Sequence, residues 1–311
     1  NHIANNNKIL QKMLAKMVHR GPDESGEYSH EYINLGMRRL IIIDKSKGSQ
    51  PMLLENDEYA IIFNGEIFNY QELRKNLEKD NIMFRSNSDT EVLLRMYIRH
   101  GTDCINRIKG MFAFCIYDKK KKLTWIVRDR FGIKPLYYSI TNDFLVFSSS
   151  LDSMIASDII NSEIDATSVK LYMLLSFIPT PNTLYRNIFK LRPGHQIVYK
   201  ENQVTISKYW DINYEHGEKR DECDYEVVEK LLNESINQHS VADQPVGTYL
   251  SGGLDSSLIT KKYHSSYSKS FKSYTANIKN HETDEDSKYA NKVSKNLRIN
   301  HTNIKIKNED F

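Results

Sequence analysis

The stretch SGGLDSS at residues 251–257 lies between two segments with different hydrophobic patterns. The apolar run 246–250 before it predicts a buried strand, and residues 258–263 after it predict the first turns of a helix. A strand, a glycine-serine turn and a helix N-terminus form a cradle for phosphate, because glycine permits close backbone approach and free N–H groups point at the anion. Asp255 is a candidate ligand for magnesium.

This turn differs from the common P-loop because it lacks the lysine of GxxxxGK[ST]. The simpler interpretation is a surface turn, since serine and glycine favour turns in general. The length of the stretch and its flanking strand and helix patterns favour the phosphate cradle.

The whole chain limits the classes of protein to consider. Its 311 residues predict two domains, and 43 basic against 40 acidic residues argue against a nucleic-acid-binding protein. No apolar run approaches 18 residues, so no membrane span is expected. The three cysteines have neither metal-site spacing nor a disulfide framework, which indicates a reducing compartment such as the cytoplasm.

Residues 1–209 predict a layered α+β domain, because short apolar runs alternate with turns and few helical patterns. A capping box of Ser88 and Glu91 starts one of the helices. The expected helices are 3–18, 71–78 and 89–99, and the expected strands are 33–35, 39–43, 59–63, 111–117, 123–127 and 144–147, with a closing hairpin over 195–210.

Residues 210–311 predict a second domain of a different kind. The polar stretch 215–224 is typical of a surface linker. Helical and strand patterns alternate after it, which favours a parallel α/β sheet. There is room for two strands and three helices, so we expect this domain to be incomplete.

Polar residues interrupt the apolar runs of the first half, and each has an ordinary structural explanation alone. Asn64-Gly65 is typical of a hairpin turn, and Asp89 suits the first turn of a helix. In their order along the chain, however, the motifs resemble glutamine-hydrolysing asparagine synthetase. They are HRGPDESG (19–26), RRLIIID (38–44), QPM (50–52), FNGEIFNY (63–70), SDTEV (88–92), GMFAF (110–114), RDRFGIKPLYY (128–138), KLRPGH (190–195) and YLSGGLDSS (249–257).

The resemblance implies a class II glutamine amidotransferase with an N-terminal-nucleophile α/β/β/α sandwich, followed by part of an ATP-pyrophosphatase domain. It implies that glutamine is hydrolysed in the first domain and that ammonia passes through the protein. ATP then adenylates the β-carboxylate of aspartate, and ammonia displaces AMP to give asparagine. ATP and Mg²⁺ are the expected cofactors, the expected partners are small molecules, and a homodimer is allowed.

The resemblance also assigns roles to residues. Arg39 matches the arginine that binds the glutamine α-carboxylate, and Glu66 and Asp89 match the acids that hold its α-amino group. Asn64 and Gly65 match the oxyanion hole. The expected ATP-binding residues are Leu250, Ser251, Gly252, Gly253, Leu254, Asp255, Ser256 and Ala276, with Asp255 also the expected metal ligand.

The sequence departs from the family pattern at the nucleophile, which is a cysteine at the mature N-terminus in that family. This chain begins Asn1-His2-Ile3, and Cys104 and Cys115 read as buried residues. Two explanations remain: the sequence is cut, so that the first strand and its cysteine are missing, or the glutaminase is inactive, as in the related β-lactam synthetases. The complete glutamine-binding set favours the cut.

Further departures are Met37, where histidine is frequent, and Ser150 and Asp152, where the family has glutamate and lysine near the passage between its sites. Two rival functions also stay open. One is amidation of another carboxylate, such as a sugar acid of a surface polysaccharide. The other is a catalytically silent homologue.

Overall fold

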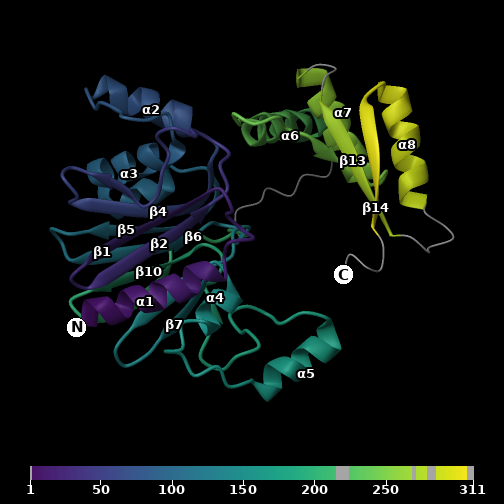
Figure 1. The fold of residues 1–311 in the computed structure, drawn as a ribbon. Coiled ribbons are helices and arrows are strands. Elements are labelled where there is room, and N and C mark those ends of the chain that lie inside the picture. Colours follow the sequence, from purple (N-terminus) through teal and green to yellow (C-terminus); the bar gives the residue numbers. More distant parts are fainter. Residues whose placement is uncertain (1, 215–223, 268–270, 279–284, 307–311) are drawn as a thin grey trace. The chain divides into compact units, whose positions relative to one another are not determined.

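The computed structural model describes residues 2–214, 224–267, 271–278 and 285–306. The chain divides into two compact units, Asn1–His216 and Gly217–Phe311, a little after the expected boundary at 209/210 (Figure 1). Each unit is described by itself below. Among the described residues, no helix has both the length and the apolar character needed to cross a membrane.

The first unit is an α+β domain with two β layers. Its helices are α1 (His2–Ala15), α2 (Tyr70–Lys79), α3 (Asp89–His100), α4 (Leu151–Ile155) and α5 (Ala166–Leu175), with a 3-10 helix η1 at Gly101–Asn106. Its strands are β1 (Glu24–His30), β2 (Ile33–Arg39), β3 (Met52–Leu54), β4 (Tyr59–Ile67), β5 (Gly110–Asp118), β6 (Leu123–Arg128), β7 (Tyr137–Ile140), β8 (Leu145–Ser148), β9 (Phe189–Lys190), β10 (His195–Lys200) and β11 (Gln203–Lys208).

Six of these strands form one sheet in the order β11-β10-β6-β5-β4-β3, and each neighbouring pair is antiparallel. Successive residues of β5 point to opposite faces. Phe112, Phe114 and Ile116 join the core that contains residues of α2 and α3. Ala113 and Cys115 join a second core on the other face. The nearly continuous apolar run of β5 therefore reflects burial on both faces.

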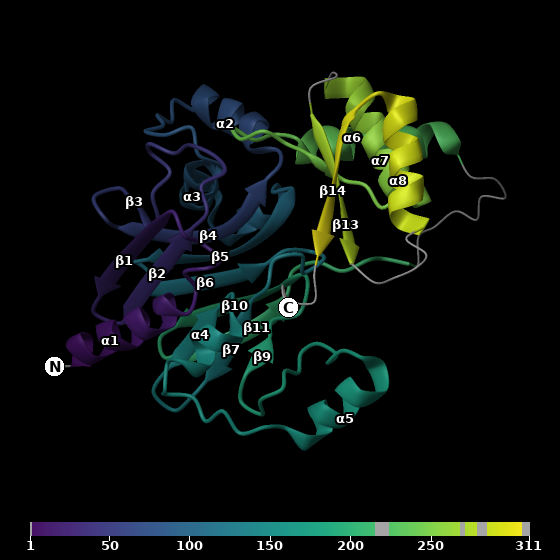
Figure 2. The ribbon, with the colours of Figure 1, turned by 45° about the vertical axis from the view of Figure 1, so that its right-hand side comes forward.

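The second β layer consists of the hairpin β1-β2 and the small sheet β8-β7-β9. Leu35 of β2 and Leu136 share the core between the layers with Ala113 and Cys115. Helices α1 and α4 contact this layer (Figure 2). Met13 and Met154 pack with Val146 of β8. Helices thus cover the outer faces of two β layers, which confirms the expected α/β/β/α sandwich.

The structure differs from the predicted strands of this unit in several places. Residues 40–43 are not a strand but part of a loop that folds back on Arg39, whose guanidinium donates to the carbonyls of Ile43 and Asp44. The guanidinium thus occupies backbone carbonyl oxygens that a strand would use as acceptors for its neighbour. The polar strand β1 was missed, because its side chains lack the apolar alternation that marks a strand.

The second unit alternates helix and strand as expected. It contains α6 (Tyr225–His239), β12 (Thr248–Tyr249), α7 (Leu254–Tyr267), β13 (Lys272–Ile278), α8 (Glu285–Leu297) and β14 (Asn300–Ile306). The strands form a parallel sheet in the order β12-β13-β14. The third strand, β14, was not predicted, because this mostly exposed edge strand has a polar sequence.

Candidate functional site: two carboxylates and a phosphate turn

The end of β4 carries three of the predicted site residues. Asn64, Gly65 and Glu66 pair with Ala113, Phe112 and Met111 of β5, respectively. A Cβ atom added at Gly65 would lie 2.1 Å from the Met111 carbonyl oxygen and 2.7 Å from the Phe112 Cα. Glycine therefore lets the two strands approach closely at this position.

Asp89 begins α3 and lies against the same end of β4. Its Oδ2 accepts a hydrogen bond of 3.1 Å from the backbone N–H of Ile67, the residue after Glu66. Burial raises the pKa of Asp89 to about 6, partly offset by backbone hydrogen bonds, and the nearby charge of Glu66 adds to the increase. A buried and a half-buried carboxylate within electrostatic reach of each other favour a cationic partner such as an ammonium group.

Arg39 ends β2, and its buried guanidinium holds the loop that follows. Nη1 donates to Glu24 Oε2 at 3.1 Å, and Nη2 donates to the carbonyl oxygens of Ile43 at 2.7 Å and Asp44 at 3.0 Å. A guanidinium has five N–H donors. The two others have no partner in the described part of the chain, so Arg39 retains donors for a carboxylate ligand.

The structure brings some of the predicted residues together directly and links others through a bridging residue. Glu66 and Asp89 lie within electrostatic reach of each other. Arg39 is linked to the segment before Asp89 through Asp44, whose Oδ2 accepts from the Asn87 N–H at 2.8 Å.

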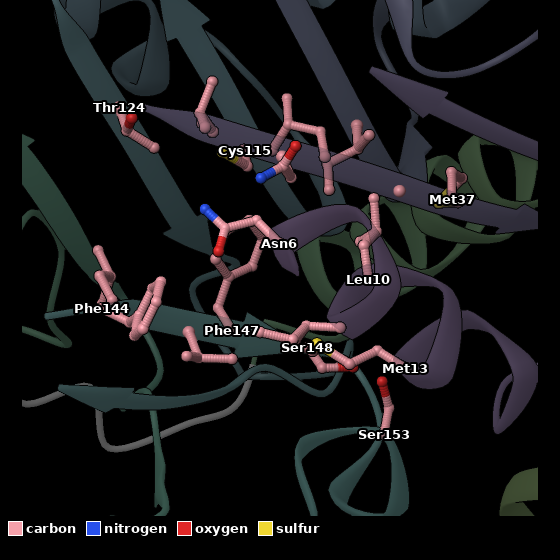
Figure 3. A pocket seen from close by; sticks show the side chains of 18 of the residues that line it. Asn6, Leu10, Met13, Met37, Cys115, Thr124, Phe144, Phe147, Ser148 and Ser153 are labelled. Atoms are coloured by element: carbon pink, nitrogen blue, oxygen red, sulfur yellow. The ribbon is translucent and has the colours of Figure 1, made fainter. Parts of the chain in front are cut away.

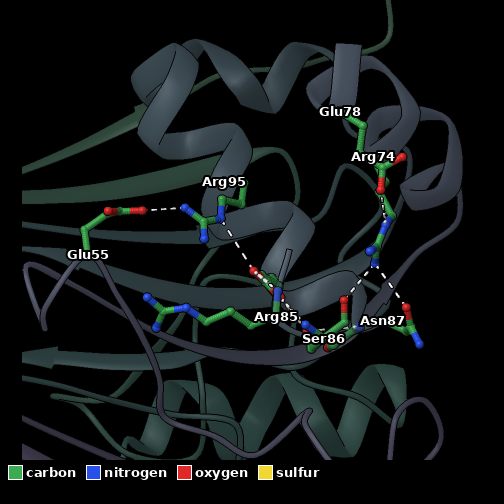
Figure 4. A network of polar contacts seen from close by, with 9 residues as sticks. Glu55, Arg74, Glu78, Arg85, Ser86, Asn87 and Arg95 are labelled. Carbon is green, nitrogen blue, oxygen red and sulfur yellow. Dashed lines mark hydrogen bonds and ion pairs between the residues drawn. The ribbon is translucent and has the colours of Figure 1, made fainter. Parts of the chain in front are cut away.

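Two further polar residues support this site: Gln50 had no predicted role, and Glu91 was expected only as part of a capping box. Gln50 accepts from the Phe63 N–H at 2.7 Å and donates to Thr90 Oγ1 at 3.3 Å, so it joins β4 to α3. The N–H groups of Arg85 and Ser86, two residues labelled in Figure 4, donate to Glu91. Both residues lie within motifs quoted above, and this position was the feature of the sequence that could have pointed to them.

The capping box expected from Ser88 and Glu91 is wrong. Ser88 Oγ accepts from the Thr90 N–H at 3.1 Å, so Ser88 does cap α3. The Ser88 N–H, however, donates to Ser86 Oγ, and Glu91 turns to the segment before the cap instead. Ser86 is buried, so its N–H needs an acceptor within the protein, and Glu91 provides it.

A cavity of about 460 Å³ lies within the first unit, between the two β layers (Figure 3). Its walls include residues 33–37 of β2, 62–64 of β4, 113–115 of β5 and 145–148 of β8, together with one face of α1. Among the described residues, β2 pairs only with β1 and β8 pairs only with β7, so both strands have an unpaired edge. Asn64 lines the cavity, and its buried Nδ2 has no hydrogen-bond partner within the described residues.

Neither described cysteine suits a nucleophilic role. Cys104 and Cys115 are fully buried free thiols, as predicted. Burial raises the pKa of the Cys104 thiol to about 12 and raises that of Cys115 as well. The reactive thiolate is therefore disfavoured at both positions. Cys223 lies outside the described residues.

In the second unit, the predicted phosphate turn connects β12 to α7. Gly252 has a φ of +82°, and a Cβ atom there would lie 2.5 Å from the Ala290 N of α8. The Ser251 and Ser256 hydroxyls lie 3.0 Å apart and bond the turn internally, while the Leu250 N–H donates to the Tyr274 carbonyl of β13 at 2.8 Å. The turn thus has the tight backbone that a phosphate cradle requires.

The remaining polar groups of this turn fit a phosphate and its counter-ion. Ser257 Oγ is buried without a partner within the described residues. Asp255 is exposed on the first turn of α7, and Ala276 is exposed on the neighbouring strand β13. Among the described residues, no group of three or more potential ligands surrounds a metal position. One carboxylate nevertheless fits Mg²⁺, which takes waters and substrate phosphates as its other ligands.

Comparison with known proteins identifies the first unit. The sequence profile of the glutamine amidotransferase domain matches residues 1–210. The chain belongs to the glutamine amidotransferase family. The asparagine synthase profile matches residues 227–311, so the two domains stand in the order implied by the sequence motifs. The resemblance to glutamine-hydrolysing asparagine synthetase is confirmed.

Two relatives show how far the similarity extends. The chain is 40% identical over 268 residues to asparagine synthetase [glutamine-hydrolyzing] 1 of Bacillus subtilis, covering 85% of this chain and 42% of the relative. It is 38% identical over 274 residues to a putative asparagine synthetase of Methanocaldococcus jannaschii, covering 80% and 52%. The chain therefore spans about half the length of these relatives, or less.

Solved structures support the fold. The allosteric regulatory enzyme of purine biosynthesis superposes with a TM-score of 0.52 at 14% identity, covering 96% of this chain and 77% of that one. At this identity, the likeness concerns the fold alone.

Proposed function

We propose that this chain is part of an enzyme that makes asparagine from aspartate with ammonia from glutamine, at the cost of cleaving ATP to AMP and pyrophosphate. The observation that carries the proposal is the pairing of Glu66 and Asp89 beside the Arg39 loop, on the same chain as the phosphate turn at 251–257. One site suits an α-amino acid, and the other suits a nucleotide.

In the proposed glutamine site, each group of the substrate has a matching partner. The Arg39 guanidinium binds the α-carboxylate through its remaining donors. Glu66 and Asp89 bind the α-ammonium group, which restores the ionised form of Asp89. The Asn64 amide and the Gly65 N–H stabilise the oxyanion that forms when the side-chain amide is attacked. Within the described part of the chain, Nδ2 of Asn64 has no partner, which supports its role as a donor.

We propose that a strand preceding Asn1 in the parent enzyme brings the nucleophile. The cavity has an unpaired strand edge on β2 and another on β8, and it is next to Asn64. An added strand would satisfy the backbone groups of both edges. A cysteine at the start of that strand would use its own α-amine as the base.

In the proposed nucleotide site, the turn 251–257 and the N-terminus of α7 bind the phosphates of ATP, and Leu250 and Ala276 contact the adenosine. Asp255 would hold Mg²⁺, which offsets the charge of the departing pyrophosphate. The aspartate β-carboxylate attacks the α-phosphate, so that β-aspartyl-AMP forms as pyrophosphate leaves. Ammonia then displaces AMP. The path of ammonia must exclude water, because ammonium lacks the nucleophilic lone pair.

ATP–pyrophosphate exchange in the full-length parent tests the acceptor. Exchange that depends on aspartate supports asparagine synthesis. If exchange depends only on another carboxylate, such as a uronic acid, that compound is the acceptor in place of aspartate. If no carboxylate supports exchange, the result favours a silent homologue. We also propose that the enzyme works in the cytoplasm, since both described cysteines are free thiols.

A further inference from the structure

Asp44 joins two segments that are far apart in the sequence. Its Oδ1 accepts from the Lys47 N–H at 2.9 Å and from Ser46 Oγ at 3.1 Å, within its own loop. Its Oδ2 accepts from the Asn87 N–H at 2.8 Å, 43 residues away. One carboxylate therefore bridges the loop 40–49, which follows Arg39, and the segment 84–88, which precedes Asp89.

The same residue fixes the Arg39 side chain. The Asp44 carbonyl accepts from Arg39 Nη2 at 3.0 Å and from the Gly48 N–H at 3.1 Å. The loop is tight, since a Cβ atom added at Gly48 would lie 2.3 Å from Arg39 Nη2. Asp44 adopts a φ of +47°, a conformation that aspartate and asparagine tolerate better than most residues.

The segment 84–88 is held from its other sides as well (Figure 4). Arg74 Nη1 donates to the Ser86 carbonyl at 2.7 Å and to Asn87 Oδ1 at 3.3 Å. Glu91 accepts from the Ser86 N–H at 2.7 Å. The segment is thus anchored to α2 and α3, and Asp44 connects this anchored unit to the Arg39 loop.

We infer that Asp44 is a positioning residue that fixes the spacing between Arg39 and Asp89, and that this spacing makes the site selective for an α-amino acid. The inference rests on the proposed function. An α-carboxylate and an α-ammonium group share one carbon, so their two binding groups must hold a fixed separation. Burial raises the pKa of Asp44, but hydrogen bonds from Asn87, Lys47 and Ser46 outweigh it and lower the pKa, so the bridge is charged at neutral pH.

The test compares Asp44→Asn with Ser46→Ala in the full-length parent. Asparagine tolerates the positive φ and nearly preserves the shape, but its amide group cannot accept at both ends. Ser46→Ala removes a contact within the loop and leaves the Asp44–Asn87 bond. We expect Asp44→Asn to raise the glutamine KM roughly tenfold, the usual scale for a lost charged hydrogen bond. We expect kcat and ammonia-dependent synthesis to stay within twofold, and Ser46→Ala to resemble the wild type.

Two further readouts make the result decisive. The Asn87 amide should exchange hydrogen at least tenfold faster in Asp44→Asn, and the preference for glutamine over glutaramate, which lacks the α-amino group, should fall. Unchanged Asn87 exchange would overturn the bridge itself. Faster exchange with an unchanged glutamine KM would overturn the positioning role. If the wild-type parent hydrolyses no glutamine, the proposed function fails and the selectivity inference fails with it, whereas amide exchange still reports on the bridge.

Discussion

Asp89 is the residue at which stability and the proposed function conflict. Its carboxyl group is buried, and its pKa is raised from 3.8 to about 6. Between these values the folded protein holds a proton that the unfolded chain has lost, so the free energy of unfolding falls as pH rises through this window. Above pH 6 the ionised group costs roughly 3 kcal/mol, from about two pKa units at 1.36 kcal/mol each.

Replacing Asp89 by Asn should therefore stabilise the protein while impairing the glutamine site. At pH 7.5 without glutamine, we expect Asp89→Asn to melt several degrees above the wild type, because the buried charge is gone and asparagine can still accept from Ile67. At pH 4 the two proteins should melt at similar temperatures. Differential scanning calorimetry at both pH values checks this, and a lower melting temperature at pH 7.5 would show that the charge has a stabilising partner.

Glutamine binding should depend on pH through the same group. The α-ammonium group prefers the ionised carboxylate, which is lost as pH falls below about 6. We expect the glutamine KM of the full-length parent to rise up to tenfold per pH unit below 6. The Asp89→Asn variant should bind glutamine weakly, and its KM should change less with pH. Steady-state kinetics from pH 5 to 8 measure this. A wild-type KM that is constant over this range would remove Asp89 from the binding set.

Arg39 and Arg38 provide a matched pair of substitutions. Arg39→Ala should raise the glutamine KM by at least tenfold, because it removes the proposed carboxylate partner and releases the Ile43 and Asp44 carbonyls. Arg38→Ala removes only a bond to the Gly21 carbonyl and should have little effect on KM. Ammonia-dependent synthesis should survive both. Equal loss of glutamine- and ammonia-dependent activity in Arg39→Ala would assign Arg39 a structural role.

At this scale, the sequence motifs led to Glu66 and Asp89 but not to the residues that hold them. Asn87 is 43 residues from Asp44, and Gln50 bonds to residues 63 and 90. Such contacts depend on how strands and loops are brought together in space. Local patterns do not record that arrangement, although Asp44 and Gln50 lay in the quoted motifs.

Among the elements, those with regular apolar spacing were predicted well, and the irregular ones were not. α3 has apolar residues at helical spacing and β5 is a nearly continuous apolar run, and both were expected. Residues 40–43 were expected to form a strand because they are rich in isoleucine, but bonds to the Arg39 guanidinium determine their path. β1 and β14 are stabilised by pairing with neighbours and carry little apolar signal of their own.

The phosphate turn offers a test at the scale of one element. Gly252→Ala should destabilise the second unit by about 1–3 kcal/mol, because the new Cβ meets α8 and φ is positive. Gly253→Ala should leave the stability of the second unit nearly unchanged, since its Cβ would meet only Ser251 Oγ at 3.5 Å. Thermal melting and ATP–pyrophosphate exchange of the full-length parent check the pair. Similar losses in both variants would show that backbone strain at Gly252 is not the cause.

For the whole molecule, the sequence patterns predicted a layered α+β domain followed by a parallel α/β sheet, and the resemblance to asparagine synthetase implied the α/β/β/α sandwich. The cavity between the β layers was not predicted, because it arises from two strands that are far apart in the sequence, β2 and β8. Its unpaired edges, and the Asn64 Nδ2 that has no partner among the described residues, support the position of the proposed nucleophile-bearing strand.

The central claim is that nitrogen released in the first unit is used at the second. The most direct test supplies the full-length parent with aspartate, Mg–ATP and glutamine labelled with ¹⁵N at the side-chain amide. We expect asparagine with ¹⁵N in its amide and equal amounts of AMP and pyrophosphate, even in the presence of excess unlabelled ammonium. Labelled ammonia released without labelled asparagine, or ATP cleaved to ADP, would contradict the account.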